Sequence, residues 1–208
     1  MSRDVKPKFY SNHRYRLSGK EQFNEVKNYH KEIFDTKNNK KNILEIGFGN
    51  GNSIINISKD KKINCFGIES YVNGIQAVEQ YINKNNINNV FIYKGDAIEI
   101  IEENFPDNFL DKILLFFPDP WPKNKHRKRR IVNLYTLKLF FKKIKKEGVL
   151  QFATDHIEYA YNIKNMLSLY LQRDILFSSN RGHRPITKYE NKAIKKNNII
   201  FDIIVKNI

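Results

Sequence analysis

Short apolar runs alternate with longer amphipathic runs along most of the chain. Five strand-like runs of closely spaced apolar residues lie at 42–49, 63–70, 90–97, 110–120 and 149–155. Each is followed by a stretch with apolar residues at helical spacing, beginning at Ser53 and at 71–85, 98–105, 131–148 and 156–171. Because strands and helices in regular alternation need parallel crossover connections, this pattern predicts an α/β fold built on a doubly wound, mostly parallel sheet.

The two ends of the chain break this rhythm. Near the C-terminus, 174–180 and 198–208 read as two strands, and 181–197 between them reads as a loop. We therefore expect an antiparallel hairpin at the sheet edge, which gives a seven-stranded sheet. Near the N-terminus, 21–35 has the apolar spacing of a helix, whereas 1–20 is basic and aperiodic. The expected organisation is a flexible arm at 1–20 before a single domain at 21–208.

Length and charge narrow the function. A chain of 208 residues fits one domain with a full core. The formal charge of +15 is concentrated, because 1–20 and 116–130 each hold six Lys or Arg residues against one Asp. Lysine-rich composition alone can reflect an AT-rich genome, but such a bias would spread the charge more evenly. The clustering favours a polyanionic partner, above all nucleic acid, and no long apolar run indicates a membrane.

Cysteine usage and the N-terminal sequence indicate the compartment. Cys65 is the single cysteine, so no disulfide can form within the chain. The N-terminus lacks the apolar core of a secretory signal. We therefore expect a cytoplasmic protein, a monomer or homodimer that needs no other protein partner and no metal.

A glycine-rich stretch with an acid before it follows the first predicted strand. Gly47, Gly49 and Gly51 alternate, which lets the backbone approach a ligand closely. The third glycine comes one residue too early for the dinucleotide pattern G-x-G-x-x-G. Glu45 would repel a pyrophosphate but can pair with an ammonium group. The stretch therefore favours a cationic ligand over a dinucleotide.

Two further acids come at the ends of the next predicted strands. Glu69 ends the second strand, where a carboxylate can accept both hydroxyls of a ribose, and Asp96 ends the third, placed to meet an adenine edge. Ligands of such sheets bind at the carboxyl ends of the strands. A ligand with adenine, ribose and a cationic amino-acid tail but no phosphate is S-adenosylmethionine, which we predict as the cofactor.

The fourth strand leads into the segment FFPDPWPKNKHRKRRI, at 116–131. Three prolines stiffen the turn and hold its acid, Asp119, at the same sheet edge as the predicted cofactor site. We expect Trp121 to have a packing role. The basic run that follows is almost free of acids, as a footprint for the phosphates of RNA should be, and its predicted RNA contacts are Lys125, Arg127, Lys128, Arg129 and Arg130.

Taken together, these segments resemble a known family. LEIGFGNGNS, FGIES, GDA, PDPWPKNKHRKRRI, ATDH and RPITKYE occur in order, and the chain is similar to the bacterial tRNA (guanine-N7)-methyltransferases, which are Rossmann-like class I enzymes. The resemblance implies that Glu45, Glu69, Asp96 and Asp119 line the S-adenosylmethionine site and that Asp119 also reaches the reaction centre. It further implies that tRNA or the target guanine is contacted by Lys123, Asp155, Thr187, Lys188, Tyr189 and Glu190. Tyr189 stands where this family often has Phe.

The implied reaction, methylation of a guanine N7 in the tRNA variable loop, suits these residues. Guanine N7 carries a lone pair and no proton, so attack on a sulfonium methyl needs no base, and the protein contributes alignment and electrostatics. Asp119 and Asp155 are suited to stabilise the cationic purine, and one of them can accept from its N1–H and amino group. Asp155 has the alternative role of capping the helix predicted from His156.

Three alternatives remain open at this point. A methyltransferase acting on an exocyclic amine of a base uses Asn/Asp-Pro-Pro-aromatic after the fourth strand, whereas this chain has Asp-Pro-Trp-Pro. A non-catalytic RNA-binding protein on a methyltransferase fold would not need the intact glycines and all four strand-end acids. A dehydrogenase disagrees with the glycine spacing.

Overall fold

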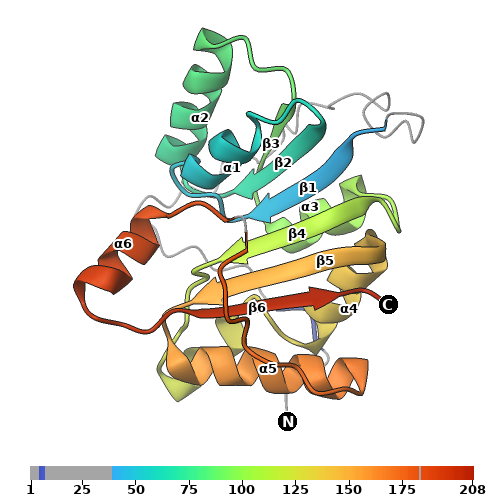
Figure 1. Cartoon of the computed structure of the whole chain (residues 1–208), viewed down its shortest axis with the longest axis vertical. Coiled ribbons are helices and arrows are strands. Elements are labelled where there is room, and N and C mark those ends of the chain that lie inside the picture. Colours follow the sequence, from blue (N-terminus) through green and yellow to red (C-terminus); the bar gives the residue numbers. More distant parts are fainter. Residues whose placement is uncertain (1–4, 8–38, 183) are drawn as a thin grey trace.

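The computed structural model describes residues 5–7, 39–182 and 184–208, and these form one mixed sheet with helices on both faces (Figure 1). The strand order is β3-β2-β1-β4-β5-β6, in which β6 pairs antiparallel with β5 and the other neighbours are parallel. The strands are β1 (Lys41–Ile46), β2 (Ile63–Glu69), β3 (Val90–Lys94), β4 (Leu110–Phe116), β5 (Ile144–Thr154) and β6 (Phe201–Lys206). The helices are α1 (Asn52–Ile57), α2 (Val72–Lys84), α3 (Ala97–Asn104), α4 (Leu134–Lys143), α5 (Ile157–Leu171) and α6 (Lys188–Lys195), with a 3-10 helix, η2 (Asn124–Arg129).

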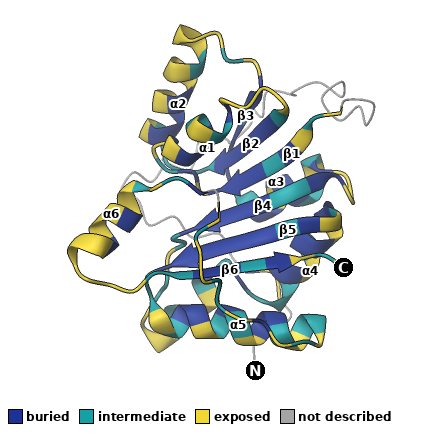
Figure 2. Cartoon of the chain, in the orientation of Figure 1, coloured by how far each residue is buried: buried dark blue, intermediate teal, exposed yellow. Residues whose placement is uncertain are grey.

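Two layers of apolar side chains hold the helices on the sheet. The smaller cluster joins α1 and α2 to one face of β2 and β3 through residues such as Ile54, Val78 and Ile92. The larger cluster joins α3, α4 and α5 to the opposite face, and its centre includes Phe140 and Tyr159. Figure 2 shows the strands almost wholly buried, whereas the outer faces of the helices are exposed. The doubly wound architecture follows from strands with apolar residues on both faces.

The five predicted strand–helix units are confirmed, with shifted boundaries around α4. The helix predicted for 131–148 begins only at Leu134, because the Asn133 side chain caps it by accepting from the amide of Thr136 at 3.0 Å. It ends at Lys143, and the chain then enters β5. The last turn of the predicted helix is therefore the first part of a long strand.

The predicted C-terminal hairpin is wrong in one strand. The segment 174–180 forms no strand, so the described residues make a six-stranded sheet; the predicted antiparallel strand at the C-terminus exists as β6, but its partner is β5. The segment runs beside β6 with one ladder-like hydrogen bond, from the Ser178 amide to the Asp202 carbonyl at 2.7 Å. The predicted loop at 181–197 contains α6, which Thr187 caps by accepting from the Glu190 amide. Thr-Lys-Tyr-Glu has the spacing of a helix-capping sequence, which the loop prediction overlooked.

The predicted helix at 21–35 and most of the predicted arm at 1–20 lie outside the described residues. The described part of the arm, Val5 to Pro7, lies along α3 and α4: the Asn133 side chain donates to the Val5 carbonyl at 3.3 Å, and Lys6 pairs with Glu102 at 2.6 Å. Pro7 is buried. Within the described part of the chain, no helix has the length and apolar character needed to cross a membrane.

Candidate active site

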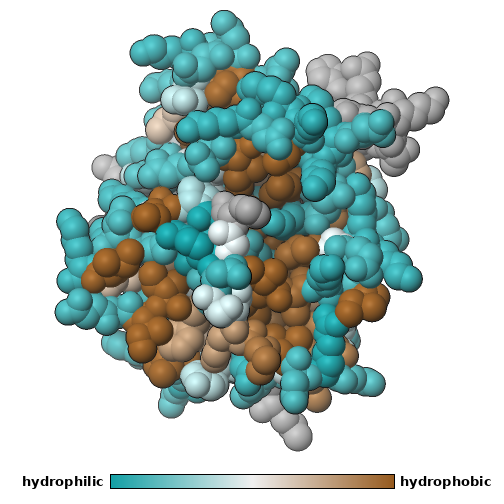
Figure 3. All heavy atoms as spheres, in the orientation of Figure 1, coloured by the Kyte–Doolittle hydropathy of each residue, from teal (hydrophilic) through white to brown (hydrophobic). Residues whose placement is uncertain are grey.

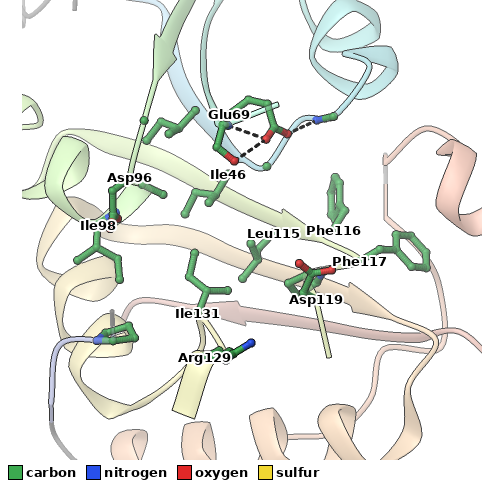
Figure 4. A pocket seen from close by; sticks show the side chains of 18 of the residues that line it. Ile46, Glu69, Asp96, Ile98, Leu115, Phe116, Phe117, Asp119, Arg129 and Ile131 are labelled. Carbon is green, nitrogen blue, oxygen red and sulfur yellow. Dashed lines mark hydrogen bonds between the residues drawn. The ribbon is translucent and has the colours of Figure 1, made fainter. Parts of the chain in front are cut away.

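A cavity of about 410 Å³ opens at the carboxyl edge of the sheet, where the strand order reverses between β1 and β4. The loops after β1, β2, β3 and β4 surround it, and Pro7 and Tyr189 complete its wall. Figure 4 shows Glu69, Asp96 and Asp119 facing this common space over an apolar floor that includes Ile46, Leu115 and Ile131. The sequence predicted this meeting of three strand-end acids, because parallel strands end at the same edge.

The loop after β1, residues 47–51, which we call the glycine loop, lets two helices pack closely around the end of that strand. Gly51 has a φ of +80° and begins α1, and a Cβ added there would lie 2.1 Å from Val78 Cγ2 on α2. A Cβ added at Gly74 on α2 would lie 2.1 Å from the carbonyl oxygen of Gly49. Gly47 and Gly49 line the cavity, whereas Gly51 shapes the loop from behind. Side chains at Gly51 or Gly74 would separate the loop from α2.

Backbone amides hold the carboxylate of Glu69 in place. Its Oε2 accepts from the Gly49 amide at 2.7 Å, and its Oε1 accepts from the amides of Ser70 and Tyr71 at 2.6 and 2.9 Å (Figure 4). Carboxylate oxygens have about four lone-pair directions between them. Glu69 therefore links two loops and keeps acceptor capacity for hydroxyls in the cavity.

Asp96 has two functions at the start of α3. Its Oδ1 accepts from the Ile98 amide at 2.7 Å and caps the helix. Burial raises the pKa of this carboxyl, and the Ile98 amide opposes part of the rise. The side chain lines the cavity beside Ala97 and Ile98, which makes this end apolar with one acceptor.

Glu45 lies behind the glycine loop rather than in the wall of the first cavity. The residue is 3% exposed, and among the described residues its Oε2 and the Oγ of Ser53 have no hydrogen-bond partner. Burial raises the pKa of Glu45 to about 8; Ser53 opposes the rise, and the charge of Glu69 adds to it. Ser53 lines a second cavity of about 220 Å³, which shares Gly47 and Tyr189 with the first.

The turn after β4 presents Asp119 to the first cavity (Figure 4). Phe117 and Trp121 have φ angles of +51° and +39°, a left-handed backbone conformation that residues other than glycine seldom adopt. The Phe117 amide donates to the Ala153 carbonyl at 2.7 Å, which ties the turn to β5. Asp119 itself is exposed, so its carboxylate is available to a ligand.

Trp121 has the packing role predicted for it. Its ring meets the ring of His126 edge-on at 5.8 Å, and the Arg129 guanidinium lies 4.8 Å from its centroid. Trp121 and Arg129 also line the cavity beside Asp119. The indole therefore joins the turn to η2 and places one arginine of the basic run in the wall of the candidate active site.

The basic run divides into exposed and buried side chains. Lys123, Lys125 and Lys128 are exposed, and Arg127 is exposed while pairing with Glu158 at 3.5 Å. Arg130 is 4% exposed, donates from Nε to the Pro120 carbonyl at 2.8 Å, and pairs with both carboxylate oxygens of Glu158. The interpretation of Arg130 as a phosphate contact is therefore corrected: its donors hold the Asp119 turn on α5.

The predicted substrate contacts near the C-terminus likewise divide into residues that line a cavity and one that is buried. Tyr189 lines both cavities, and Thr187 and Lys188 line the second. Burial raises the pKa of the Tyr189 hydroxyl, and the carboxylates of Glu69 and Asp119 add to the rise. Glu190 is 3% exposed and pairs with Arg181 and Arg184, so its predicted substrate contact is replaced by a structural role.

Asp155 and Lys123 follow strands that end at the carboxyl edge of the sheet, but neither is among the described residues that line the two cavities. Asp155 accepts from the side chain of Asn198 at 2.9 Å. His156, not Asp155, caps α5, by accepting from the Tyr159 amide at 3.3 Å. The alternative capping role for Asp155 is therefore wrong, and its carboxylate remains at the surface of the edge.

Sequence reasoning does not predict the roles of two residues at this edge. Arg184 is the buried partner of Glu190 and Asp202, and no local pattern distinguishes it from a surface arginine. Ser53 was seen only as the start of a helix, although its position in the glycine-rich stretch puts it beside Glu45. In both cases the signal lies in contacts between distant segments.

Comparisons with known proteins agree with this geometry. Residues 39–203 match the family model described as "Putative methyltransferase". The chain is 36% identical over 181 residues to a tRNA (guanine-N(7)-)-methyltransferase of Francisella philomiragia, covering 85% of this chain and 78% of that protein. A protein of the same name from Buchnera aphidicola subsp. Baizongia pistaciae is 38% identical over 174 residues, covering 80% and 71%.

Solved structures show the same fold at low sequence identity. An antibiotic-related methyltransferase is 18% identical with a TM-score of 0.58, covering 84% of this chain and 91% of that one. A SAM-dependent methyltransferase from Aquifex aeolicus is 15% identical with a TM-score of 0.54, covering 85% and 87%. Fold, cavity and sequence matches agree, and the chain belongs to the family of tRNA (guanine-N(7)-)-methyltransferases.

Proposed function

We propose that this protein transfers a methyl group from S-adenosylmethionine to N7 of a guanine in the variable loop of tRNA. The observation that carries the proposal is the convergence of Glu69, Asp96 and Asp119 on one cavity beside an exposed basic surface. The names of the curated relatives support the same activity.

The residues present fit the cofactor at each of its parts. Asp96 with the apolar Ile98 suits adenine, and the fixed carboxylate of Glu69 suits the ribose hydroxyls. The Oε2 of Glu45, buried behind the glycine loop, and the Oγ of Ser53, which lines the second cavity, suit the charged groups of an amino-acid tail. Buried polar atoms without partners are rare in proteins, so these two atoms support a polar ligand at this end.

The reaction requires no general acid or base from the protein. S-adenosylmethionine supplies the methyl as part of a sulfonium cation, and the lone pair of guanine N7 forms the new bond as the carbon–sulfur bond breaks. Positive charge moves from sulfur to the purine, so a carboxylate beside the purine stabilises the transition state. Asp119 stands in the cavity wall for this role, on a turn that hydrogen bonds to Arg130 and to β5 hold in place.

The exposed cations beside the cavity suit the phosphates of tRNA. Lys123, Lys125 and Lys128 project from η2 and its start, next to the turn that carries Asp119. Arg127 shares its charge with Glu158 and is the weaker candidate. Phosphate contacts of this kind position an RNA without reading its sequence. Base selection then falls to the cavity, where Asp119, Arg129 and Tyr189 surround the space for the target.

Nucleoside analysis of methylated tRNA tests the proposal. Unmodified tRNA transcript, incubated with the protein and methyl-labelled cofactor, should yield 7-methylguanosine, and the Asp119→Asn variant should yield little. A labelled N2-methylguanosine or N6-methyladenosine would instead indicate a base-amine methyltransferase. Cofactor binding without any labelled nucleoside would indicate a non-catalytic RNA-binding protein.

A further inference from the structure

A buried ion-pair cluster ties α6 to the end of the sheet. Arg184 donates from Nε and Nη2 to the two carboxylate oxygens of Asp202 on β6, at 2.6 and 2.8 Å, and from Nη1 to Glu190 on α6. The side chains of Arg184 and Glu190 are 1% and 4% exposed. We call Arg184, Glu190 and Asp202 the α6 clamp.

The α6 clamp also touches the turn that carries Asp119. The guanidinium carbon of Arg184 lies 5.9 Å from the ring centroid of Phe116 and 5.7 Å from that of Phe117. Both phenylalanines line the first cavity, and Phe117 has the left-handed backbone that turns the chain toward Asp119. A cation packed on these rings resists their displacement.

Tyr189 connects the α6 clamp to the candidate active site. It directly precedes Glu190 on α6, and its Cε2 would lie 3.7 Å from a Cβ added at Gly49 in the glycine loop. Tyr189 is the one described residue of α6 that lines both cavities. A shift of Glu190 would therefore move the wall of both cavities.

Helix α6 depends on this buried anchor because it stands at the periphery of the fold (Figure 1). Figure 3 shows apolar atoms exposed on the side of the molecule where α6 lies, and the exposed apolar residues of α6 and its flanks are Ile186, Tyr189, Ile194 and Ile199. The buried side chains of α6 are Glu190 and Ala193. Glu190 is therefore the larger of two buried attachments.

A buried ion pair is a poor way to stabilise a fold, because desolvation cancels much of the attraction, but it fixes geometry. We propose that Arg184 is a positioning residue, which holds Tyr189 and the Asp119 turn at a fixed spacing around the bound cofactor. This inference rests on the proposed function for the identity of the cofactor. Arg184 itself is not among the described residues that line the cavities, and it packs behind the wall residues Phe116 and Phe117.

A double-mutant cycle on cofactor affinity tests the inference. Arg184→Lys keeps the charge but loses the planar fork that reaches two carboxylates, and Glu190→Gln removes the α6 side of the clamp. Each is made alone and with Tyr189→Ala. The control is Lys143→Gln at the opposite edge of the sheet, where a buried lysine contacts the Phe105 carbonyl and Asp107. Calorimetry gives the Kd of S-adenosylhomocysteine, urea unfolding gives stability, and tRNA methylation gives kcat.

If the α6 clamp acts through Tyr189, each clamp variant raises Kd about tenfold, and adding it to Tyr189→Ala changes Kd less than about twofold further. The control should lower the urea midpoint and leave Kd within about twofold of wild type. Kd values near wild type for Glu190→Gln, or effects that multiply with Tyr189→Ala, would overturn the inference. If Arg184→Lys fails to fold, Glu190→Gln still decides between the outcomes, because Arg184 remains paired with Asp202 in that variant.

The two proposals fail in different ways. If the variants show the coupled Kd changes but the wild-type protein transfers no methyl group to tRNA, the proposed function is refuted and the role of Arg184 is supported. If the wild-type protein methylates tRNA but the Kd changes of the clamp variants multiply with that of Tyr189→Ala, the proposed function is supported and the role of Arg184 is refuted.

Discussion

Replacing Glu45 with glutamine should stabilise the cofactor-free protein, and the gain should grow with pH. Burial under the glycine loop holds the pKa of Glu45 at about 8, against an ordinary value of 4.5; the Ser53 side chain opposes part of this rise, and the charge of Glu69 adds to it. Between these two values the folded chain keeps a proton that the unfolded chain releases. Stability therefore falls as the pH rises through this window.

The size of the effect follows from the two pKa values. The shift from 4.5 to about 8 corresponds to about 5 kcal/mol once the pH exceeds both values. At pH 7 the integrated loss is about 3 kcal/mol, since the folded-state carboxyl is still mostly protonated. Glutamine has a similar shape and no charge, so Glu45→Gln should remove this pH-dependent loss and keep the packing.

Urea unfolding of both proteins without cofactor, at a series of pH values from 5 to 9, measures the difference directly. The wild-type free energy of unfolding should fall relative to Glu45→Gln by about 3 kcal/mol between pH 5 and 8. Saturating S-adenosylhomocysteine should stabilise the wild type more than the variant at pH 8, because the proposed function pairs its ammonium group with the ionised carboxylate of Glu45. A difference between the two proteins that stays constant with pH would refute the reasoning.

Three further predictions concern the Asp119 turn and the basic run. Asp119→Asn should lower kcat about 100-fold with the unfolding midpoint unchanged, because an exposed carboxylate that acts on the transition state contributes little to the fold; steady-state kinetics with tRNA and thermal unfolding check this. Filter binding at several salt concentrations should show the log–log salt slope reduced by about 2 to 3 when glutamine replaces Lys123, Lys125 and Lys128. Arg130→Gln should leave that slope unchanged and lower stability by about 2 kcal/mol, since its donors are buried against Glu158 and Pro120; urea unfolding measures the loss.

The sequence predicted those parts of the fold that depend on local periodicity and on chain order. Alternating strand and helix patterns fix a doubly wound sheet, and that sheet brings the residues after successive strands to one edge. Glu69, Asp96 and Asp119 therefore could be placed together before their side-chain contacts were known. The glycine spacing predicts close approach of the backbone to a ligand; the structure adds a close contact within the chain, since a Cβ at Gly74 would lie 2.1 Å from the Gly49 carbonyl oxygen.

The sequence could not predict which charges of a cluster are buried. Arg129 and Arg130 are adjacent, yet one lines the cavity and the other is enclosed by Glu158 and Pro120, because successive side chains of the segment point in different directions. The same difficulty hid Arg184, whose partners lie on α6 and β6. Burial of a charge is a property of tertiary contacts, and those contacts join segments that are far apart in the chain.

The C-terminal error has a different cause. Residues 174–180 have strand-like composition and run beside β6, but the chain makes one ladder-like bond there and continues as an irregular segment. β-propensity describes how side chains fit a pleated surface, and it does not count the hydrogen bonds that an edge segment forms. Helix α6 was missed because its eight residues carry more charge than a core-facing pattern requires.

Mapping the methylated nucleotide tests the central claim most directly. Unmodified tRNA is incubated with the protein and S-adenosylmethionine, treated with borohydride and aniline, and the cleavage products are resolved to single nucleotides. Borohydride–aniline treatment cleaves the chain at 7-methylguanine, so the account predicts one new cleavage at a guanine of the variable loop, absent with Asp119→Asn. Methyl incorporation without aniline cleavage, or cleavage outside the variable loop, would contradict it.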